Sequence, residues 1–295
     1  MESKKNLYAQ SILFLLPALI LFFLFVVYPI LGSIRYSFTE WNGISQQVKA
    51  VGLANYIEFF HEKNALAALK RTFLLAVYVV VIQNAVGLLV AELLDHNIRG
   101  KKWFRAIYFA PGMLSTIIVA YLWNFIYSPM NGVLENLFSA LGLERLAAVK
   151  WLADPDLVLY SIGNAMIWQS FGFSMLLYIA GMQSISDEYY EAARLDGASA
   201  WEVFRHVKFP LLAPVFTINI VLSVMGALKQ FDHIFLMTGG GPGKASQTMT
   251  VLIFDQSFGV HRFGYGTALS VILIAIILVL SLVQLRLLQA REVEL

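Results

Sequence analysis

The chain has 295 residues, of which 59% are hydrophobic and 14% are charged, and its mean hydropathy is +0.69. Soluble domains hold about 45–50% apolar and about 25% charged residues, so this composition excludes an ordinary soluble domain and indicates an integral membrane protein. The formal net charge of +2 comes without a basic patch, which argues against a nucleic-acid partner, and the absence of cysteine excludes disulfides, thiol catalysis and cysteine-ligated zinc.

Six apolar segments reach the length of about 20 residues that a membrane-crossing helix needs. They are residues 11–34, 72–94, 106–127, 157–183, 211–236 and 266–288. The first follows Lys4 and Lys5, but its apolar run exceeds the about 7–15 residues of a signal peptide, so we expect it to be retained. The sequence therefore predicts an all-α integral membrane protein in which residues 1–295 form a single transmembrane domain of six helices.

Basic residues are densest in the segments that face the cytoplasm if the N-terminus lies inside. The short loop 95–105 alone holds Arg99, Lys101, Lys102 and Arg105. The positive-inside rule therefore places both termini in the cytoplasm. The outer segments are then residues 35–71, 128–156 and 237–265.

A polar segment, residues 186–210, separates the fourth and fifth predicted spans and lies in the cytoplasm in this orientation. Ser186 can cap a helix whose first turn holds two acids, where the helix dipole favours negative charge. Gly197 suits the left-handed conformation that commonly ends a helix. The pattern predicts a first short helix that ends at this glycine.

A second short helix is predicted from Ser199 to Pro210. Ser199 and Glu202 have the spacing of a capping box. Trp201, Phe204 and Val207 follow at helical spacing and form an apolar stripe that could rest against the membrane domain. On spacing alone, an amphipathic helix lying on the membrane surface explains this segment equally well.

The stretch EAARLDGASAWEVFRHVKFP, residues 191–210, resembles the EAA loop of binding-protein-dependent ABC importer permeases. That loop reads Glu-Ala-Ala, three residues, Gly, nine residues, Ile, one residue, Leu-Pro. The matching residues are Glu191, Ala192, Ala193, Gly197 and Pro210. Val207 and Phe209 stand in place of the Ile and Leu, and both keep the apolar bulk.

The resemblance implies that this segment is a coupling helix, which docks on a separate cytoplasmic ATPase and carries its movement into the membrane. The residues that would carry the coupling are Glu191, Ala192, Ala193, Arg194, Asp196 and Gly197. Their chemistry agrees, because small alanines can sink into a groove while charged side chains make polar contacts at its rim.

The glycine-rich stretch TGGGPGKAS, residues 238–246, is not a nucleotide-binding loop. A Walker A sequence needs glycine where Thr238 stands and Ser or Thr where Ala245 follows Lys244. On pattern alone it is a flexible turn after the fifth span. It also resembles the segment after the fifth span in sugar-class importer permeases, as SFTEWNG and VGLANYIEFF do after the first span and FRAIYFAPGMLSTIIVAYLWNFIY does at the third.

The resemblance covers nearly the whole chain and is closest to the shorter, six-span member of the permease pair in carbohydrate importers of the maltose/glycerol-phosphate type. It implies a non-enzymatic subunit that moves a sugar or oligosaccharide across a prokaryotic cytoplasmic membrane by alternating access. The implied partners are a second homologous permease subunit, a cytoplasmic ABC ATPase dimer and an extracytoplasmic sugar-binding protein. The chain itself would hold no catalytic residue, metal or cofactor, because the partner ATPase binds ATP and Mg.

Polar side chains at membrane depth indicate a cavity or a helix contact, since lipid cannot satisfy them. Ser223, Gly226, Ala227 and Gln230 would share one helix face. Amides beside aromatic rings suit a neutral sugar. The candidate pathway residues are Gln83, Asn84, Asn124, Gln169, Phe173, Ser223, Gly226, Ala227 and Gln230. For each amide, a hydrogen bond that simply joins two helices is the alternative, worth about 0.6 kcal/mol.

Two other functions remain open from the residues alone. An ion-coupled secondary transporter of a small polar solute would need an embedded acid, but Glu92 and Asp232 lie near the ends of their spans. Lys229 and Asp232 are three residues apart and are expected to pair near the outer interface, or to form part of an outer gate. A membrane enzyme has no support, because no catalytic set or metal-ligand spacing is present.

Overall fold

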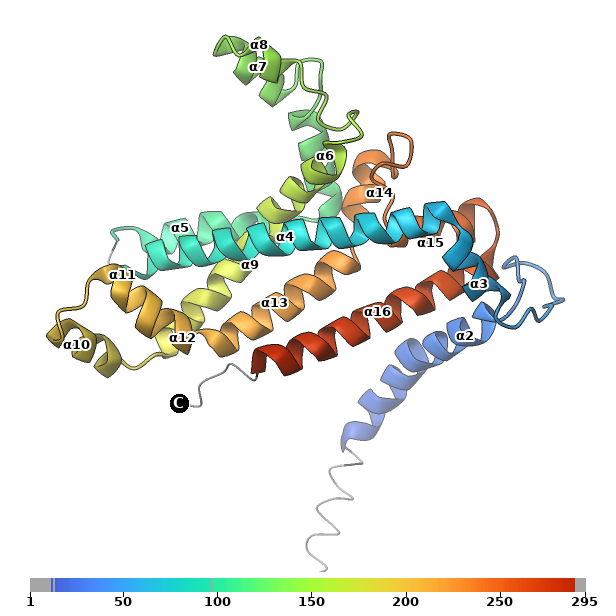
Figure 1. Ribbon diagram of the computed structural model, residues 1–295, viewed down its shortest axis with the longest axis horizontal. Helices are drawn as coiled ribbons and strands as arrows, with labels where there is room; N and C mark the ends of the chain where they lie inside the picture. Colours follow the sequence, from blue (N-terminus) through green and yellow to red (C-terminus); the bar gives the residue numbers. More distant parts are fainter. Residues whose placement is uncertain (1–11, 13, 97, 290–295) are drawn as a thin grey trace, which may run out of the picture. The chain divides into compact units, whose positions relative to one another are not determined.

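The computed structural model describes residue 12, residues 14–96 and residues 98–289 (Figure 1). Across these ranges the chain is helical apart from its turns and loops, and the β-type pairing found there is an isolated bridge between Thr39 and Ala50. The all-α fold class is therefore confirmed. The expectations for Lys4, Lys5 and both termini fall outside the described residues.

Four described helices are long and apolar enough to cross a membrane. They are Phe14–Ser37, α4 (Lys63–Asp95), α9 (Val158–Ser184) and α16 (Phe263–Gln289). These correspond to the first, second, fourth and sixth predicted spans. Two further pairs of helices pass the same test only if each bent pair counts as one span.

The third predicted span, residues 106–127, is not one straight helix. It consists of α5 (Lys101–Phe109), a 3₁₀ turn (Ala110–Met113) and α6 (Thr116–Ile126), with a bend of 99°. Pro111 lies at the start of the 3₁₀ turn, and Ser115 caps α6 by accepting a hydrogen bond from the Ile118 amide. Hydropathy records the length of an apolar run but not the proline and cap that divide it.

The fifth predicted span, residues 211–236, is also divided. The helix that begins at Ala200 runs to Leu211 and bends by 68° into α13 (Ala213–Leu228). A separate helix, α14 (Asp232–Thr238), follows after Lys229 ends α13. Ser223 and Gln230 therefore do not lie on one continuous helix, which corrects the face expected from their spacing.

Two of the helices widen into a π turn directly before a proline. The π turns are Phe23–Val27, ahead of Pro29, and Phe204–Lys208, ahead of Pro210. In each, the amide before the proline bonds to the carbonyl five residues back, Tyr28 to Phe23 and Phe209 to Phe204. A proline ring clashes with the carbonyl four residues back, and the wider turn relieves that clash.

The remaining helices are shorter. They are α2 (Tyr28–Ser37), α3 (Ala54–His61), α7 (Val133–Ala140), α8 (Glu144–Ala147), α10 (Asp187–Leu195), α11 (Ala200–Val203), α12 (Phe209–Leu211), α15 (Met249–Phe254) and a π turn (Asp255–Gly259).

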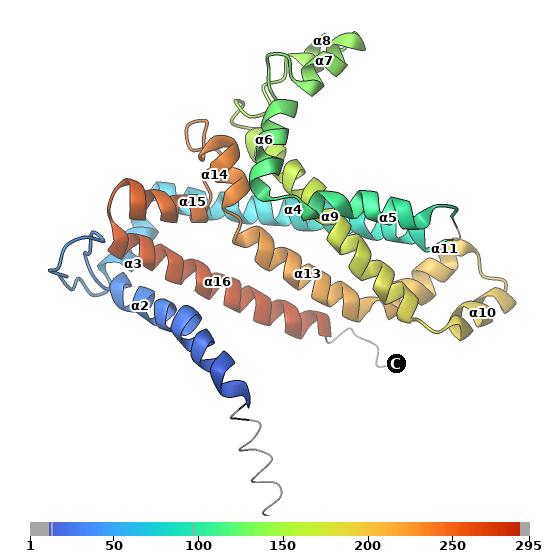
Figure 2. The ribbon, with the colours of Figure 1, turned by 180° about the vertical axis from the view of Figure 1, so that it is seen from behind.

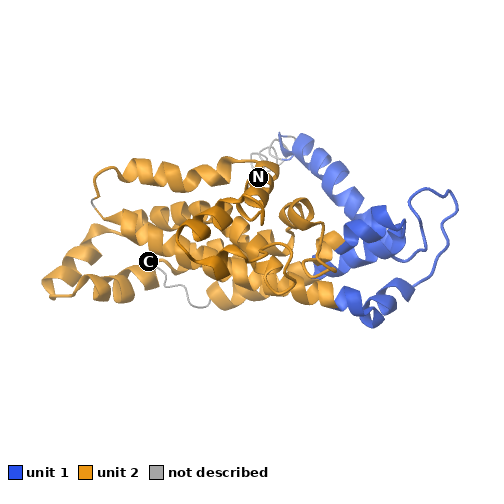
Figure 3. Cartoon of the chain, turned by 90° about the horizontal axis from the view of Figure 1, so that it is seen from above, with its two compact units in different colours: residues 1–66, 252–275 blue, residues 67–251, 276–295 orange. Residues whose placement is uncertain are grey.

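The chain divides into two compact units, coloured separately in Figure 3. Unit 1 comprises Met1–Leu66 and Leu252–Ala275, and unit 2 comprises Ala67–Val251 and Ile276–Leu295. The expected single domain is not tested by this division, because α4 and α16 each run through both units without a break.

An ion pair ties the two chain segments of unit 1 together. The Arg262 guanidinium donates to both carboxylate oxygens of Glu58, at 2.8 and 2.6 Å. The hydrogen bond to Glu58 raises the pKa of Arg262. The Tyr265 hydroxyl bonds to Glu62, and the Trp41 ring packs on Phe263. These contacts join the segment after Ser37 to the start of α16.

Helix α9 is the central helix of unit 2. In Figures 1 and 2 it packs against α5 and α13, and hydrogen bonds such as that from Tyr78 to Asn164 join it to α4. Of its most apolar 18-residue window, 56% is buried, whereas the window of Phe14–Ser37 has 0% buried. The contact with α5 depends on Gly172, because a Cβ there would lie 2.2 Å from the Tyr108 carbonyl oxygen.

We expect Gly172→Ala to destabilise the protein by about 1–3 kcal/mol, since an added methyl group forces α5 away from α9. Gly226→Ala is the matched control, because its Cβ would meet no heavy atom within 4 Å. Thermal unfolding in detergent, followed by tryptophan fluorescence, measures both. Equal unfolding temperatures for the two variants would contradict the close approach.

Candidate functional site

The segment between α9 and α13 folds locally as its caps predict. The Ser186 side chain accepts a hydrogen bond from the Glu188 amide at the start of α10. Gly197 has φ +79°, and its amide bonds to the Arg194 carbonyl while the Ala198 amide bonds to that of Ala193. These two bonds form a Schellman motif, which turns the chain sharply after α10.

The second helix begins with the expected capping box. The Ser199 amide donates to Glu202 Oε2 at 2.7 Å, and the Glu202 amide donates to Ser199 Oγ at 3.4 Å. This helix does not stop at Pro210, because the π turn lets it continue to Leu211. Of the expected apolar stripe, Phe204 and Val207 are half-buried, whereas Trp201 is 64% exposed and is not covered by the rest of the described chain.

The coupling residues expected from the sequence are available to a partner. Glu191, Ala192, Arg194, Asp196 and Gly197 are exposed, and Ala193 is half-buried. Sequence reasoning missed Leu195, which is 89% exposed on the last turn of α10. An exposed leucine beside the turn offers an apolar anchor that the EAA pattern does not specify.

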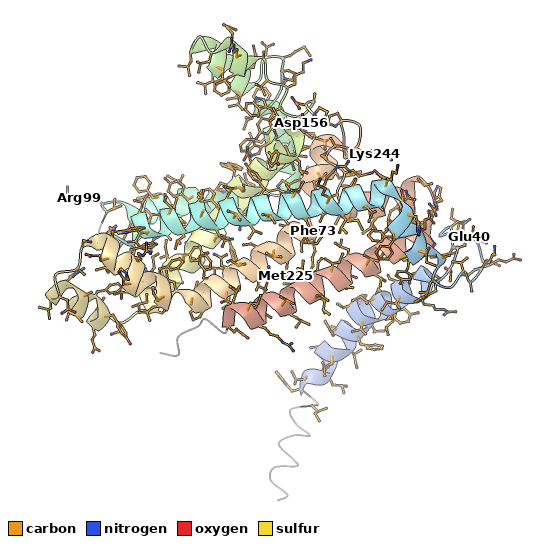
Figure 4. The ribbon with its side chains drawn as sticks, viewed as in Figure 1. Glu40, Phe73, Arg99, Asp156, Met225 and Lys244 are labelled. Atoms are coloured by element: carbon orange, nitrogen blue, oxygen red, sulfur yellow. The ribbon has the colours of Figure 1, made fainter. Side chains whose placement is uncertain are left out.

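Residues 186–210, which we call the coupling segment after their expected role, and the basic loop after α4 lie at the same end of unit 2. Figure 4 labels Arg99 close to α10 and α11, whereas Lys244 lies away from them. This is the arrangement expected if residues 95–105 and 186–210 both face the cytoplasm.

A cavity of about 410 Å³ lies within unit 2 between α4, α5, α9, α13 and the segment after α13. It has the size of a small-ligand pocket. Seven of the predicted pathway residues line it, namely Gln83, Gln169, Phe173, Ser223, Gly226, Ala227 and Gln230. Sequence reasoning missed Phe109, Thr116, Met166, Ser170, Asn219, Leu222 and His233, which also line it.

Part of the cavity wall is a hydrogen-bonded seam between three helices. Gln83 Nε2 of α4 donates to Ser174 Oγ of α9 at 2.9 Å, and Ser174 Oγ donates to Asn219 Oδ1 of α13 at 3.1 Å. Ser170 Oγ donates to Gln83 Oε1 at 2.8 Å. Gln83 and Asn219 therefore do both: their hydrogen bonds join helices, and their side chains also line the cavity.

Two other glutamines keep part of their hydrogen-bonding capacity. Gln169 Nε2 donates to the Leu114 carbonyl at 2.9 Å, and Gln230 Nε2 lies 2.7 Å from His233 Nδ1. Among the described residues, their amide oxygens have no partner. Phe173 is 49% exposed beside them. An amide oxygen and a ring face are therefore open toward the cavity.

Two predicted pathway residues lie elsewhere. Asn84 is buried and donates to the Val80 carbonyl and Ser223 Oγ, while Tyr178 donates to its Oδ1. Asn124 donates weakly to the Leu236 carbonyl at 3.5 Å and lines a separate hollow beside Trp151. The sequence places both amides at membrane depth but does not show that Asn84 is satisfied by its neighbours while the Asn124 amide oxygen has no partner among the described residues.

The predicted pair of Lys229 and Asp232 is wrong. Both side chains are exposed, and no ion pair joins them in the part of the chain that the structure describes. The break between α13 and α14 explains this, because the two residues are not on one helix.

The glycine-rich stretch is folded back on itself rather than a flexible turn. Thr238 Oγ1 lies 2.8 Å from Ser246 Oγ, which donates to the Gly241 carbonyl at 2.6 Å. Ser246, Gln247 and Thr248 are buried. The Ser246 side chain therefore ties the end of this stretch to its beginning.

No group of three or more His, Cys, Asp or Glu side chains that could hold a metal ion occurs within the described ranges.

The chain is similar to known membrane transport proteins along most of its length. Residues 83–293 match the family described as binding-protein-dependent transport system inner membrane component. The chain is 31% identical over 280 residues to the multiple sugar-binding transport system permease protein MsmF of Streptococcus mutans, covering 95% of this chain and 95% of that protein. It is 31% identical over 274 residues to the trehalose/maltose transport system permease protein MalF of Thermococcus litoralis, covering 93% and 92%.

A solved structure has the same fold. It is a bacterial ABC transporter involved in the import of the acidic polysaccharide alginate, with a TM-score of 0.85 and 23% sequence identity over 98% of this chain and 99% of that chain. At this identity the likeness concerns the fold alone.

We expect Gly226→Cys to react with a small water-soluble methanethiosulfonate at least about tenfold faster than Thr217→Cys, because reactivity follows exposure. Gly226 faces the cavity, whereas Thr217 on the same helix is 4% exposed. The chain has no cysteine of its own, so mass spectrometry reads each site without background. Equal rates at the two positions would show that the cavity is not open to water.

Proposed function

The chain belongs to the family of binding-protein-dependent transport system inner membrane components, and from this premise we propose that it is the membrane subunit of an ATP-driven importer of a neutral sugar or oligosaccharide. The observation that carries the proposal is the connection between two sites. Helices α9 and α13 supply much of the cavity wall, and the segment that joins them presents α10 to a partner. Displacement of α10 would therefore act on α9 and α13, and so on the parts of the cavity wall that these two helices supply.

The exposed surface of α10 supports a coupling role. The Schellman turn at Gly197 makes the helix protrude, and the small side chains of Ala192 and Ala193 allow it to sink into a groove. The exposed side chains of Glu191, Arg194 and Asp196 lie near these alanines in the sequence and would make polar contacts with the rim of that groove. An exposed leucine at position 195 adds an apolar contact on the same partner.

The cavity supports a neutral sugar as the transported molecule. Its described lining contains amides, hydroxyls, aromatic rings and one histidine, His233, and no Asp, Glu, Lys or Arg. Sugar hydroxyls pair with amides, and the apolar faces of sugar rings pack on aromatic side chains. The two relatives named for sugar transport agree with this choice. An acidic saccharide would bring a charge that no Lys or Arg of this lining neutralises.

The importer would need three partners. These are a second homologous permease subunit, a cytoplasmic ATPase dimer that binds ATP and Mg, and an extracytoplasmic sugar-binding protein. The chain would bind no cofactor itself. ATP binding would close the ATPase dimer, α10 would move, and the cavity would open outward to receive sugar from the binding protein.

The proposed location is the cytoplasmic membrane of a prokaryote, with six spans and both termini in the cytoplasm. In this orientation the Arg99 loop and α10 face the ATPase. Six spans require that each bent helix pair contributes one span, the fifth of them through α13.

We expect Gly197→Pro and Glu191→Lys each to uncouple transport from ATP hydrolysis while the protein still inserts. Proline has no amide to donate to the Arg194 carbonyl and cannot adopt φ +79°, and lysine reverses a charge on the docking surface. Uptake and ATP hydrolysis are measured together in proteoliposomes that contain the whole importer. Glu188→Lys, an exposed change on the first turn of α10, is the control. Wild-type uptake by the well-expressed double variant would overturn the coupling role.

We expect Gln230→Ala and Phe173→Ala each to raise the KM for sugar about five- to tenfold, as the loss of a hydrogen bond or a stacked ring of about 1 kcal/mol implies. The substrates are radiolabelled neutral di- and trisaccharides, with a uronic acid disaccharide as the acidic comparison.

Asn124→Ala is the control, because this amide lies outside the cavity. A KM raised by Asn124→Ala and left unchanged by Gln230→Ala would place the sugar elsewhere. Preferred uptake of the uronic acid disaccharide would contradict a neutral substrate.

A further inference from the structure

A buried cation joins the coupling segment to the last turn of α4. Lys208 Nζ donates to both carboxylate oxygens of Glu92 at 2.9 Å and to Asp95 Oδ2 at 2.8 Å. The Lys208 side chain is only 8% exposed. Its three donors therefore meet three carboxylate oxygens, and we call these three residues the Lys208 cluster.

Glu92 and Asp95 need this cation because of where they stand. They lie one turn apart at the C-terminal end of α4, where the negative pole of the helix dipole disfavours carboxylates. Their side chains are 22% and 23% exposed, so water screens them only in part. Charged groups in such surroundings have to be paired.

Lys208 reaches them because of the π turn before Pro210. The turn inserts one extra residue into the helix and so rotates the residues after it by about 100°. Lys208 is the last residue of that turn. Pro210 thus has two effects, since it widens the helix and fixes the direction of the lysine that precedes it.

A second cavity, of about 790 Å³, separates α10 from the end of α4. Asp187, Tyr190 and Arg194 line its α10 side, and the three residues of the Lys208 cluster also line it. The Tyr190 ring lies 5.8 Å from Lys208 Nζ, and burial raises the pKa of its hydroxyl, which has no partner among the described residues. Apolar packing also joins these parts of the chain, since Ile185 and Leu212 share a buried cluster with Ala91 and Leu94 of α4, and the Lys208 cluster adds a directional contact between charged groups.

We propose that the Lys208 cluster is the strut through which the coupling segment moves α4. Helix α4 is continuous from Lys63 to Asp95, so a displacement at Glu92 reaches Gln83, which lines the sugar cavity. The coupling segment then acts on a third wall of the cavity besides α9 and α13. Lys208 is a positioning residue in this role, and the proposal rests on the proposed importer function.

Two variants separate transmission from stability. Lys208→Met alone leaves two carboxylates unpaired and so destabilises the fold. The triple variant Lys208→Met, Glu92→Gln, Asp95→Asn removes all three charges together and leaves no unpaired ion. Lys208→Arg keeps the charge. Arg205→Met, an exposed change on the same π turn, is the matched control.

The experiment measures sugar uptake per ATP hydrolysed by the whole importer in proteoliposomes. We expect the triple variant to lose about fivefold or more of this ratio, as coupling of 1–3 kcal/mol between two sites implies, while its unfolding temperature stays near that of the wild type. Lys208→Arg should restore the ratio, and Arg205→Met should leave it unchanged. A folded triple variant with the wild-type ratio overturns the proposal.

A second measurement does not depend on transport. The chain has no native cysteine, so spin labels can be placed at Leu93→Cys on α4 and Glu188→Cys on α10 in the full chain. We expect a narrow distance distribution with the Lys208 cluster intact and a broad one in the triple variant. An unchanged distribution overturns the strut even if transport is ATP-driven. A wild-type importer without ATP-driven uptake, combined with the broadened distribution, overturns the proposed function alone.

Discussion

The hydrogen-bonded seam between α4, α9 and α13 is the interaction on which the rest of the molecule depends. In lipid there is no hydrophobic force to bring helices together, so small residues and polar contacts hold them. Ser174 stands at the centre of the seam, with Gln83 on one side and Asn219 on the other. The same amides line the 410 Å³ cavity, which means that the helices are joined where the cavity is formed.

This arrangement links the site that would bind sugar to the site that would bind the ATPase. The seam holds α4 and α13 to α9, the coupling segment continues directly into α13, and the Lys208 cluster reaches the far end of α4. A movement of α10 would therefore reach α9 and α13 through the chain itself. It would reach α4 through the ion pairs of the Lys208 cluster. Each path ends at residues that line the cavity, such as Ser223 and Gln83.

Local sequence signals predicted the parts of the fold that short-range chemistry determines. The caps at Ser186, Ser199 and Gly197 define α10 and the turn after it, because each acts within four residues of itself. Hydropathy located the long helices but not the bends before α6 and α13, where prolines divide apolar runs of sufficient length.

The cavity was predictable only in part, because amides of the same kind have different neighbours. Asn84 is satisfied by Tyr178, which is 94 residues away in the sequence, whereas Gln169 keeps an oxygen for a ligand. No local sequence pattern predicted the ion pairs of Lys208, because its partners lie 116 and 113 residues earlier in the chain. Long-range pairing of this kind follows from the packing of helices and leaves no local pattern.

The most direct test of ATP-driven coupling measures how accessible the cavity lined by Gly226 is during the ATP cycle. A cysteine at position 226 in the assembled importer is exposed to an impermeant thiol reagent from the extracytoplasmic side, with no nucleotide or with ATP under conditions that block hydrolysis. If closure of the ATPase opens the cavity outward, the cysteine is modified slowly without nucleotide and markedly faster when ATP is bound. The same rate in both states, in an importer that hydrolyses ATP, would show that the ATPase does not move this chain.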